Sequence, residues 1–229
     1  MRTKTYFLSD AHLGSRSMNA NKESEKKLVS FLDNIKDEAK ALYLLGDIFD
    51  FWYEYKNVVP KGFTRFLGKL AELADSGVEI HYFTGNHDIW CYGYLEEEIG
   101  LKLHRQDLIT DIAGHKFYLS HGDGLGDPSK SFKLIRKIFH NPICQKLFSF
   151  LHPRIGMSIG LAWSAHSRNK KNNQDIYQSY KGEDKEHLVL FAKAYTKEPI
   201  DFFIFGHRHI MLDLALRNKS RILILGDWI

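Results

Sequence analysis

The first half of the chain alternates short apolar or β-branched runs with longer segments whose apolar residues recur every three or four positions. The runs predict strands near residues 4–8, 41–45 and 78–83, and the segments between them predict helices near 21–35 and 63–75. Strands that alternate with helices are typical of a mainly parallel sheet covered by helices. The pattern therefore indicates an α/β fold.

The second half is richer in strands that follow one another directly. Apolar runs predict strands near residues 107–112, 115–120, 201–205, 211–216 and 221–225. The sequence Asn218-Lys-Ser between the last two is typical of a hairpin turn, so this half is expected to be antiparallel or mixed. At 229 residues the chain is long enough for a complete core, and we predict one domain over residues 1–229.

A long segment interrupts the strands between His121 and His207. Connections between neighbouring elements usually have about two to six residues, so an insert over about 125–197 must have a structure of its own. Apolar residues recur at helical spacing in its first part, namely Phe132, Ile135, Phe139, Ile143, Leu147 and Phe150. Pro142 is expected to begin a second helix within this part.

The insert also holds the excess positive charge of the chain, whose formal net charge is +4. Residues 128–174 contain nine Lys or Arg and no Asp or Glu, whereas the rest of the chain has more acidic than basic residues. Two interpretations fit this mixture of cations and apolar residues. The helices pack into the core and leave a solvated cationic face, or they form an amphipathic lid that receives a lipid chain or lies on an anionic bilayer.

Five short motifs place polar side chains directly after predicted strands. In chain order they are Asp10-Ala-His12, Gly46-Asp47, Gly85-Asn86-His87-Asp88, His121-Gly122-Asp123 and Gly206-His207-Arg208-His209. Open α/β sheets bind ligands at the carboxyl ends of their strands, so the five motifs are expected to converge there. One such motif alone is more often a turn or a hydrogen-bonded histidine. The occurrence of all five together favours a shared site.

The residue types suit two divalent cations held about 3.5–4 Å apart. Such a pair needs a bridging carboxylate, for which we predict Asp47, and imidazole or carbonyl ligands. Asp10 and His12 are predicted to bind one ion, since residues two apart on an extended strand end point the same way. The other predicted ligands are His209 for that ion and Asn86, His121 and His207 for the second ion. Neighbouring glycines leave room where the backbone turns sharply or passes close to an ion.

Two bound cations lower the pKa of a water molecule and neutralise charge on phosphoryl oxygens. The sequence therefore predicts a hydrolase that cleaves a phosphodiester or a pyrophosphate. His87, next to the predicted ligand Asn86, is expected to protonate the leaving oxygen or to stabilise its charge. No nucleophilic Ser or Cys is needed for such a reaction.

The order of the motifs resembles that of the calcineurin-like metallophosphoesterases, over nearly the whole chain from Asp10 to His209. This resemblance implies a sandwich of two sheets flanked by helices. Asp50, three residues after Asp47, resembles the carboxylate that orients the catalytic histidine in that superfamily, here His87.

The residues around the motifs are most similar to the UDP-2,3-diacylglucosamine hydrolases of lipid A synthesis. The similar segments are Leu8–Gly14, Leu45–Trp52, Gly85–Trp90 and His121–Leu125. This chain has His87 where well-known proteobacterial members have Arg. The resemblance implies cleavage at the phosphate attached to uridine, which gives UMP and 2,3-diacylglucosamine 1-phosphate. It also implies two metal ions, expected to be Mn²⁺, and a cytoplasmic enzyme peripherally associated with the inner membrane.

In this interpretation the insert receives the substrate. Apolar side chains of the insert, Phe139 and Leu147 among them, are predicted to face an acyl chamber or the bilayer. The residues predicted to contact the diphosphate or the nucleotide are Ser167, Arg168, Asn169, Lys170 and Lys171. A solvated cationic face is the alternative for that cluster. The expected partners are a glycolipid nucleotide and an anionic membrane surface, with no nucleic acid and no protein partner inferred.

Two other functions are alternatives. A nuclease or nucleotide phosphodiesterase would bind a phosphate backbone through the basic residues. The basic residues here are interleaved with apolar residues at helical spacing, whereas stacking on bases needs aromatic side chains that face solvent. A metal-binding scaffold without activity would have no need of His87 beside Asn86.

Two remaining features concern the cellular compartment. Cys91 and Cys144 are the only cysteines and have no paired spacing, which favours a reducing compartment over a disulfide or structural zinc framework. The first residues include no apolar signal region, and no run of about eighteen apolar residues occurs. We therefore expect a protein that is neither exported nor membrane-spanning.

Overall fold

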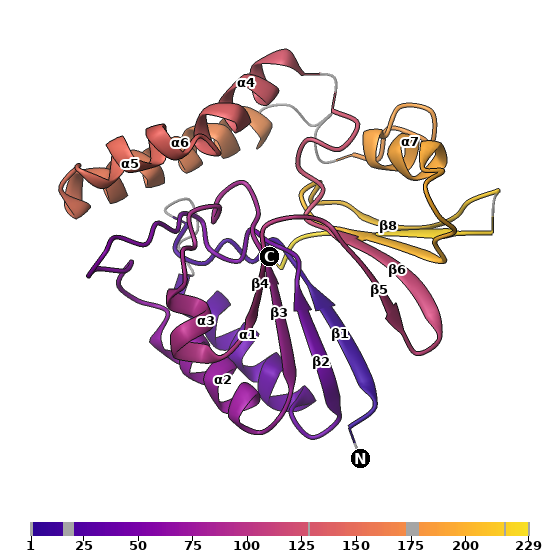
Figure 1. The fold of residues 1–229 in the computed structure, drawn as a ribbon, viewed down its shortest axis with the longest axis horizontal. Coiled ribbons are helices and arrows are strands. Elements are labelled where there is room, and N and C mark those ends of the chain that lie inside the picture. Colours follow the sequence, from indigo (N-terminus) through magenta and orange to yellow (C-terminus); the bar gives the residue numbers. More distant parts are fainter. Residues whose placement is uncertain (1, 16–20, 128, 173–178, 218, 229) are drawn as a thin grey trace.

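The computed structural model describes residues 2–15, 21–127, 129–172, 179–217 and 219–228. These residues form two β-sheets that face each other, with helices on the outer face of each sheet (Figure 1). A further layer of helices lies beyond the carboxyl ends of the strands of the first sheet. The two-sheet α/β sandwich predicted from the sequence is therefore confirmed.

The first sheet is wholly parallel and has the strand order β1-β2-β3-β4. Its strands are β1 (Lys4–Leu8), β2 (Ala39–Leu44), β3 (Glu79–Phe83) and β4 (Lys102–His104). The helices that cover its outer face are α1 (Asn21–Ile35), α2 (Thr64–Asp75) and α3 (Tyr94–Ile99). Because the strands are parallel, their carboxyl ends meet at one edge of the sheet.

The second sheet is mixed, as expected, and has the order β5-β6-β7-β9-β8. Its strands are β5 (Leu108–Ile112), β6 (His115–Ser120), β7 (Phe202–Phe205), β8 (Met211–Ala215) and β9 (Arg221–Leu225). The outer pairs β5–β6 and β8–β9 are antiparallel, and β6, β7 and β9 are parallel to one another. Helix α7 (His187–Ala194) packs on this sheet, where Leu188 and Val189 are fully buried.

Strand β2 shows how the layers are held together. Its side chains Leu42 and Leu44 pack into the core that the first sheet shares with its helices. Those of Ala41 and Tyr43 point the other way and pack between the two sheets. Successive side chains of a strand alternate between its faces, so a strand covered on both sides must be apolar throughout. This explains why residues 41–45 form a continuous apolar run.

The helical layer consists of α4 (Lys130–Phe139), α5 (Pro142–Ser149) and α6 (Pro153–Asn172). As predicted, Pro142 is the first residue of a helix, and the side chain of Asn141 caps α5 by accepting from the backbone N–H groups of Ile143 and Cys144. On α6, Gly160 lies so close to the ring of Phe51 that a Cβ atom would be 2.3 Å from it. A glycine at this position lets the layer approach the loop after β2.

Three elements were not predicted from the sequence. Helix α3 and strand β4 are short, with six and three residues. Helix α7 falls within the predicted insert of about 125–197, but it packs into the core of the second sheet. The layer that lies apart from the sheets is therefore formed by residues 130–172. The last part of the predicted insert, which contains α7, belongs to the core of the second sheet.

Candidate metal centre

The five motifs converge where strands of both sheets end. Asp10 and His12 follow β1, Asp47 follows β2 and Asn86 follows β3, and His121 follows β6. The loop after β7 contributes His207 and His209. Three overlapping clusters result, in each of which the candidate ligand atoms lie within 4.8 Å of one another: Asp10/His12/His209, His12/Asp47/His87 and Asp47/His121/His207.

The backbone of these loops differs from the sequence prediction. Asp10 and His12 were expected on an extended strand end, but they have φ of 52° and 43°, and His207 and His209 likewise have positive φ of 68° and 51°. This left-handed conformation costs a residue with a Cβ atom about 1–2 kcal/mol. The loops turn sharply at these residues. The turns, and not the alternating side-chain directions of an extended strand, point both side chains of each pair toward the site. Backbone strain of this kind concentrates at functional sites.

Glycines in the motifs allow the loops to pass close to the carboxylates. A Cβ atom on Gly85 would lie 2.2 Å from Oδ1 of Asp47, and one on Gly206 would lie 2.6 Å from Oδ2 of Asp10. Either contact is far shorter than two such atoms tolerate. The prediction that these glycines remove side-chain bulk is thus explained by close approach to the acidic side chains.

The first candidate ion site is formed by Asp10, His12 and His209. The two imidazole Nε2 atoms face each other at 3.3 Å, and Nε2 of His209 lies 3.5 Å from Oδ1 of Asp10. Oδ1 of Asp10 is buried and has no hydrogen-bond partner among the described residues, while Oδ2 accepts from the backbone N–H of His207 at 2.9 Å. A buried carboxylate oxygen aimed at two imidazole nitrogens suits a divalent cation.

The second candidate ion site is formed by Asp47, Asn86, His121 and His207. Oδ2 of Asp47 lies 3.4 Å from Nε2 of His121, and that nitrogen lies 3.3 Å from Oδ1 of Asn86. Asp47 also belongs to the cluster with His12, whose Nε2 is 3.9 Å from the same Oδ2. Asp47 thus lies between both groups, which is the position that a bridging carboxylate requires.

Surrounding acceptors orient two of the imidazoles. Nδ1 of His121 lies 2.8 Å from the carbonyl oxygen of Leu45. A carbonyl only accepts, so Nδ1 carries the proton, and Nε2 is left to bind a metal. Nδ1 of His209 lies 3.4 Å from Oδ2 of Asp227 in the same manner. Such partners are typical of metal-binding histidines and hold the ring in its ligating orientation.

The electrostatics of the cluster favour positive charge. Burial opposes the charge of both Asp47 and His121, but their mutual attraction outweighs it. It holds the pKa of Asp47 well below its usual range and raises the pKa of His121 to about 10. Burial raises the pKa of Asp10, against the attraction of His209. Divalent cations would satisfy the same carboxylates while leaving the imidazoles neutral.

His87 lies beside the candidate ion sites, with 8% of its surface exposed. Its Nδ1 donates to the backbone carbonyl of Asp50 at 3.0 Å, and its Nε2 lies 3.9 Å from Oδ2 of Asp47. The carboxylate of Asp50 is 4.0 Å from Nδ1 of His87 and accepts from the hydroxyl of Ser164 at 2.7 Å. Asp50 therefore contacts His87 through its carbonyl, and its carboxylate connects the site to α6.

Asp88 was part of a predicted motif but received no role from the sequence. Its buried carboxylate accepts from the backbone N–H groups of Asp47, Ile48 and Gly85 and from the hydroxyl of Tyr82. Burial, with the nearby charge of Asp47, raises the pKa of Asp88 to about 6. Asp88 fixes the loops after β2 and β3 to each other, so it positions Asp47 relative to Asn86.

Arg208 has a similar role on the other side of the site. Its guanidinium donates to both oxygens of the fully buried Glu186, at 2.7 and 3.0 Å. Glu186 precedes α7, so the ion pair holds the Gly-His-Arg-His loop against that helix. Neither residue was singled out from the sequence, because the pairing of an arginine with a glutamate 22 positions away leaves no local pattern.

The sequence profile described as calcineurin-like phosphoesterase matches residues 3–211. The chain belongs to the calcineurin-like phosphoesterase family. A UDP-2,3-diacylglucosamine hydrolase of Porphyromonas gingivalis (strain ATCC BAA-308 / W83) is 44% identical over 240 residues, which cover 100% of this chain and 92% of that protein. A UDP-2,3-diacylglucosamine hydrolase of Yersinia pestis bv. Antiqua (strain Angola) is 27% identical, with 98% and 90% covered. Among solved structures, a dimetal phosphatase from Danio rerio LOC 393393 is 13% identical and has a TM-score of 0.43, with 98% of this chain and 87% of that chain covered.

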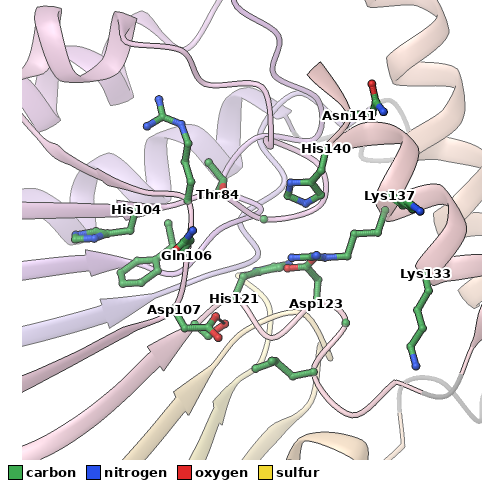
Figure 2. A pocket seen from close by; sticks show the side chains of 17 residues that line it. Thr84, His104, Gln106, Asp107, His121, Asp123, Lys133, Lys137, His140 and Asn141 are labelled. Carbon is green, nitrogen blue, oxygen red and sulfur yellow. Dashed lines mark hydrogen bonds and ion pairs between the residues drawn. The ribbon is translucent and has the colours of Figure 1, made fainter. Parts of the chain in front are cut away.

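The protein is thus a hydrolase of a family that uses divalent metal ions. Two cavities of this phosphoesterase adjoin the candidate metal centre. The apolar cavity, of about 290 Å³, lies between the loops after β2 and β3 and the helical layer, and Asn86 and His87 are part of its wall. The polar cavity, of about 800 Å³, includes His121 in its wall (Figure 2).

The predicted substrate-binding residues are distributed unevenly about these cavities. Phe139 lines the apolar cavity, and its ring packs against Trp90 and Trp163 at centroid distances of 5.1 and 5.6 Å. Ser167 lines the same cavity. Leu147 is 63% exposed and lies outside the lining of the apolar cavity, so its predicted contact with an acyl chamber or the bilayer stays a prediction. The side chains of Arg168, Asn169, Lys170 and Lys171 lie outside the described residues.

Proposed function

We propose that this phosphoesterase hydrolyses the pyrophosphate of UDP-2,3-diacylglucosamine at the phosphate attached to uridine. The products would be UMP and 2,3-diacylglucosamine 1-phosphate. The observation that carries the proposal is an apolar cavity that begins at the candidate metal centre. Its wall combines Asn86 and His87 of the candidate metal centre with Phe132, Phe139 and Trp163 of the helical layer. Two relatives whose names state this activity support the same substrate.

The apolar cavity suits an acyl chain better than a polar substrate. Rings of Phe51, Trp90 and Phe148 line it, together with Ile159 and Trp163 of α6. Each methylene buried against such side chains contributes about 0.8 kcal/mol. A chain held there would place the glucosamine 1-phosphate beside Asn86 and His87, which lie in the same wall.

The donor set of the site fits two Mn²⁺ ions, which accept carboxylate, amide and imidazole ligands. Asp10, His12 and His209 would hold one ion, and the remaining ligands, Asn86, His121 and His207, the other, with Asp47 between them. When bound, the ions would supply an activated water and neutralise charge on the phosphoryl oxygens.

His87 would serve the leaving group. Its Nδ1 proton is committed to the carbonyl of Asp50, so Nε2 is the atom that can donate a hydrogen bond or a proton toward the reacting phosphate. The link from the Asp50 carboxylate to Ser164 joins this arrangement to α6, whose Trp163 lines the acyl cavity. The same helix therefore contacts the catalytic loop and the proposed lipid site.

The outer face of the helical layer supports docking on an anionic membrane surface. Exposed apolar side chains of the layer that do not line the apolar cavity are Leu134, Ile143, Leu147, Phe150 and Ile155. Basic residues of the same helices include Lys130, Lys146 and Arg154. Apolar and basic side chains together are typical of helices that lie in the membrane interface. No helix in the described part of the chain has the length and apolar content needed to cross a bilayer.

The proposal is tested with the purified protein and UDP-2,3-diacylglucosamine in the presence of Mn²⁺. We expect UMP and the diacylated sugar 1-phosphate in equal amounts, and loss of both on chelation by EDTA. A uridine nucleotide sugar without acyl chains is the matched control, and we expect it to be a much poorer substrate. Equal kcat/KM on the acylated and unacylated compounds would contradict the proposed role of the apolar cavity.

A further inference from the structure

The polar cavity and the apolar cavity both adjoin the candidate metal centre. Asp123 and Arg136 line both cavities, and the guanidinium of Arg136 donates to the carboxylate of Asp123 at 2.6 Å. His121 faces the polar cavity, whereas Asn86 and His87 face the apolar one. A substrate with its scissile phosphate at the candidate metal centre can therefore reach both an apolar space and a polar space.

The two walls of the polar cavity differ in charge (Figure 2). Lys133 and Lys137 of α4 line one wall. No salt bridge joins either lysine to an acidic side chain among the described residues. Gln106 and Asp107, from the loop after β4, line the opposite wall. A phosphate is attracted to the lysine wall, and groups that donate hydrogen bonds are attracted to the carboxylate of Asp107.

The wall with Asp107 is rigid and has free acceptor capacity. The hydroxyls of Tyr118 and Ser120 donate to its two carboxylate oxygens and hold the side chain in place. An ionised carboxylate has about four lone-pair positions, so it can also accept from the hydroxyls of a ribose. Gln106 offers both a carbonyl and an amide N–H₂, which complement the carbonyl and N–H groups of a uracil edge.

We propose that the polar cavity binds the uridine monophosphate half of the substrate. Lys133 and Lys137 face its phosphate, and Gln106 and Asp107 face its base and ribose. This inference rests on the proposed function. It places the nucleotide in the polar cavity and not at the cluster of residues 167–171, which the sequence pattern had indicated. The acyl chains then occupy the apolar cavity, and the pyrophosphate crosses the metal centre between the two cavities beside Arg136.

The test measures UMP binding to the Mn²⁺-loaded protein by isothermal titration calorimetry. Gln106→Ala and the double change Lys133→Ala with Lys137→Ala each remove side chains of one wall, and all three residues are exposed, so the fold should persist. Lys27→Ala, at an exposed position of α1, is the matched control. A thermal melt of each variant checks that it is folded.

We expect the double lysine variant to bind UMP roughly tenfold or more weakly and with a smaller dependence on salt. Gln106→Ala should bind both UMP and uridine about two- to tenfold more weakly, as for a lost neutral hydrogen bond. The lysine variant should lose much less affinity for uridine, which has no phosphate. Lys27→Ala should bind UMP as the unmodified protein does.

Equal UMP affinity in all folded variants would overturn the inference, even if UDP-2,3-diacylglucosamine is hydrolysed, in which case the proposed function would stand alone. A different result would also distinguish the nucleotide site from the proposed substrate. If UMP binding depends on these residues but the diacylated substrate is not hydrolysed, the nucleotide site is supported and the proposed substrate is wrong.

Discussion

The candidate metal centre and the helical layer differ in which side chains they bury and which they expose. Asp10, His12 and Asp47 have at most 1% of their surface exposed, and neighbouring loops hold their positions through backbone hydrogen bonds. Helices α4 and α5, all of whose residues are described, have no buried side chain, and Phe150 is 76% exposed. Polar residues are thus buried in one region, and apolar residues are exposed in the other.

This contrast indicates that the two regions have different roles. Metal binding and stabilisation of charge on a phosphate need ligands in fixed positions, and burial with fixed hydrogen bonds provides them. Recognition of a lipid needs an apolar surface that is accessible before the substrate binds. Substitutions at the candidate metal centre should therefore change metal content and rate, and substitutions in the helical layer should change binding of lipid.

The largest effect is expected for Asp47→Ala. Asp47 lies between both candidate ion sites, so its loss should remove metal from both and abolish turnover. Metal content by elemental analysis, together with the rate on bis-p-nitrophenyl phosphate, checks the prediction. Asp37→Ala, at an exposed acidic position, is the control and should retain metal and rate. An active Asp47→Ala protein with two ions per chain would refute the bridging role.

The next largest effect is expected for His87→Ala. This change should keep both ions but lower kcat by about 10²–10⁴-fold, the usual range for a general acid. Asp50→Asn should give a smaller loss, because the backbone carbonyl that orients His87 remains. His115→Ala, at an exposed histidine, is the control. A rate for His87→Ala near that of the control, with metal saturating, would assign His87 to structure.

Phe139→Asp should act on the lipid alone. Phe139 lines the apolar cavity and its ring packs against Trp90 and Trp163, so an aspartate there should repel an acyl chain without removing a metal ligand. If about three or four methylenes lose their apolar contact, kcat/KM on UDP-2,3-diacylglucosamine falls by roughly 100-fold. The loss on bis-p-nitrophenyl phosphate should be far smaller. Similar losses on both substrates would identify Phe139 as an ordinary packing residue.

The smallest effect is expected at the outer face of the helical layer. Leu147 and Phe150 are 63% and 76% exposed, so changing both to Asp should leave the fold intact. Binding to vesicles that contain phosphatidylglycerol should weaken by roughly tenfold, since interfacial binding scales with buried apolar area. Hydrolysis of substrate dispersed in detergent should change little by comparison. Unaltered vesicle binding would exclude this face as the membrane contact.

The sequence predicted the ligand loops well because strand ends are fixed by local patterns. An apolar run followed by Asp10 or Asp47 identifies both the strand and its carboxyl end. The left-handed backbone at Asp10 and His207 was not predictable in the same way. It depends on five loops that meet in space, and those contacts are absent from the local sequence.

The helical layer was predicted less completely for a physical reason. Phe139 and Leu147 have the same apolar character and similar helical spacing, but one faces a cavity and the other faces solvent. A hydrophobic pattern identifies an apolar face and leaves open what covers it. Asp88 and the Arg208–Glu186 pair were missed because their partners are distant in sequence.

In the proposed reaction, water attacks the uridine-linked phosphate at the candidate metal centre while the acyl chains occupy the apolar cavity. Hydrolysis of UDP-2,3-diacylglucosamine in H₂¹⁸O, with mass spectrometry of both products, tests it most directly. We expect one ¹⁸O atom in UMP and an unlabelled diacylglucosamine 1-phosphate. Label in the sugar phosphate, or no cleavage by the metal-loaded protein, would contradict attack at the uridine-linked phosphate.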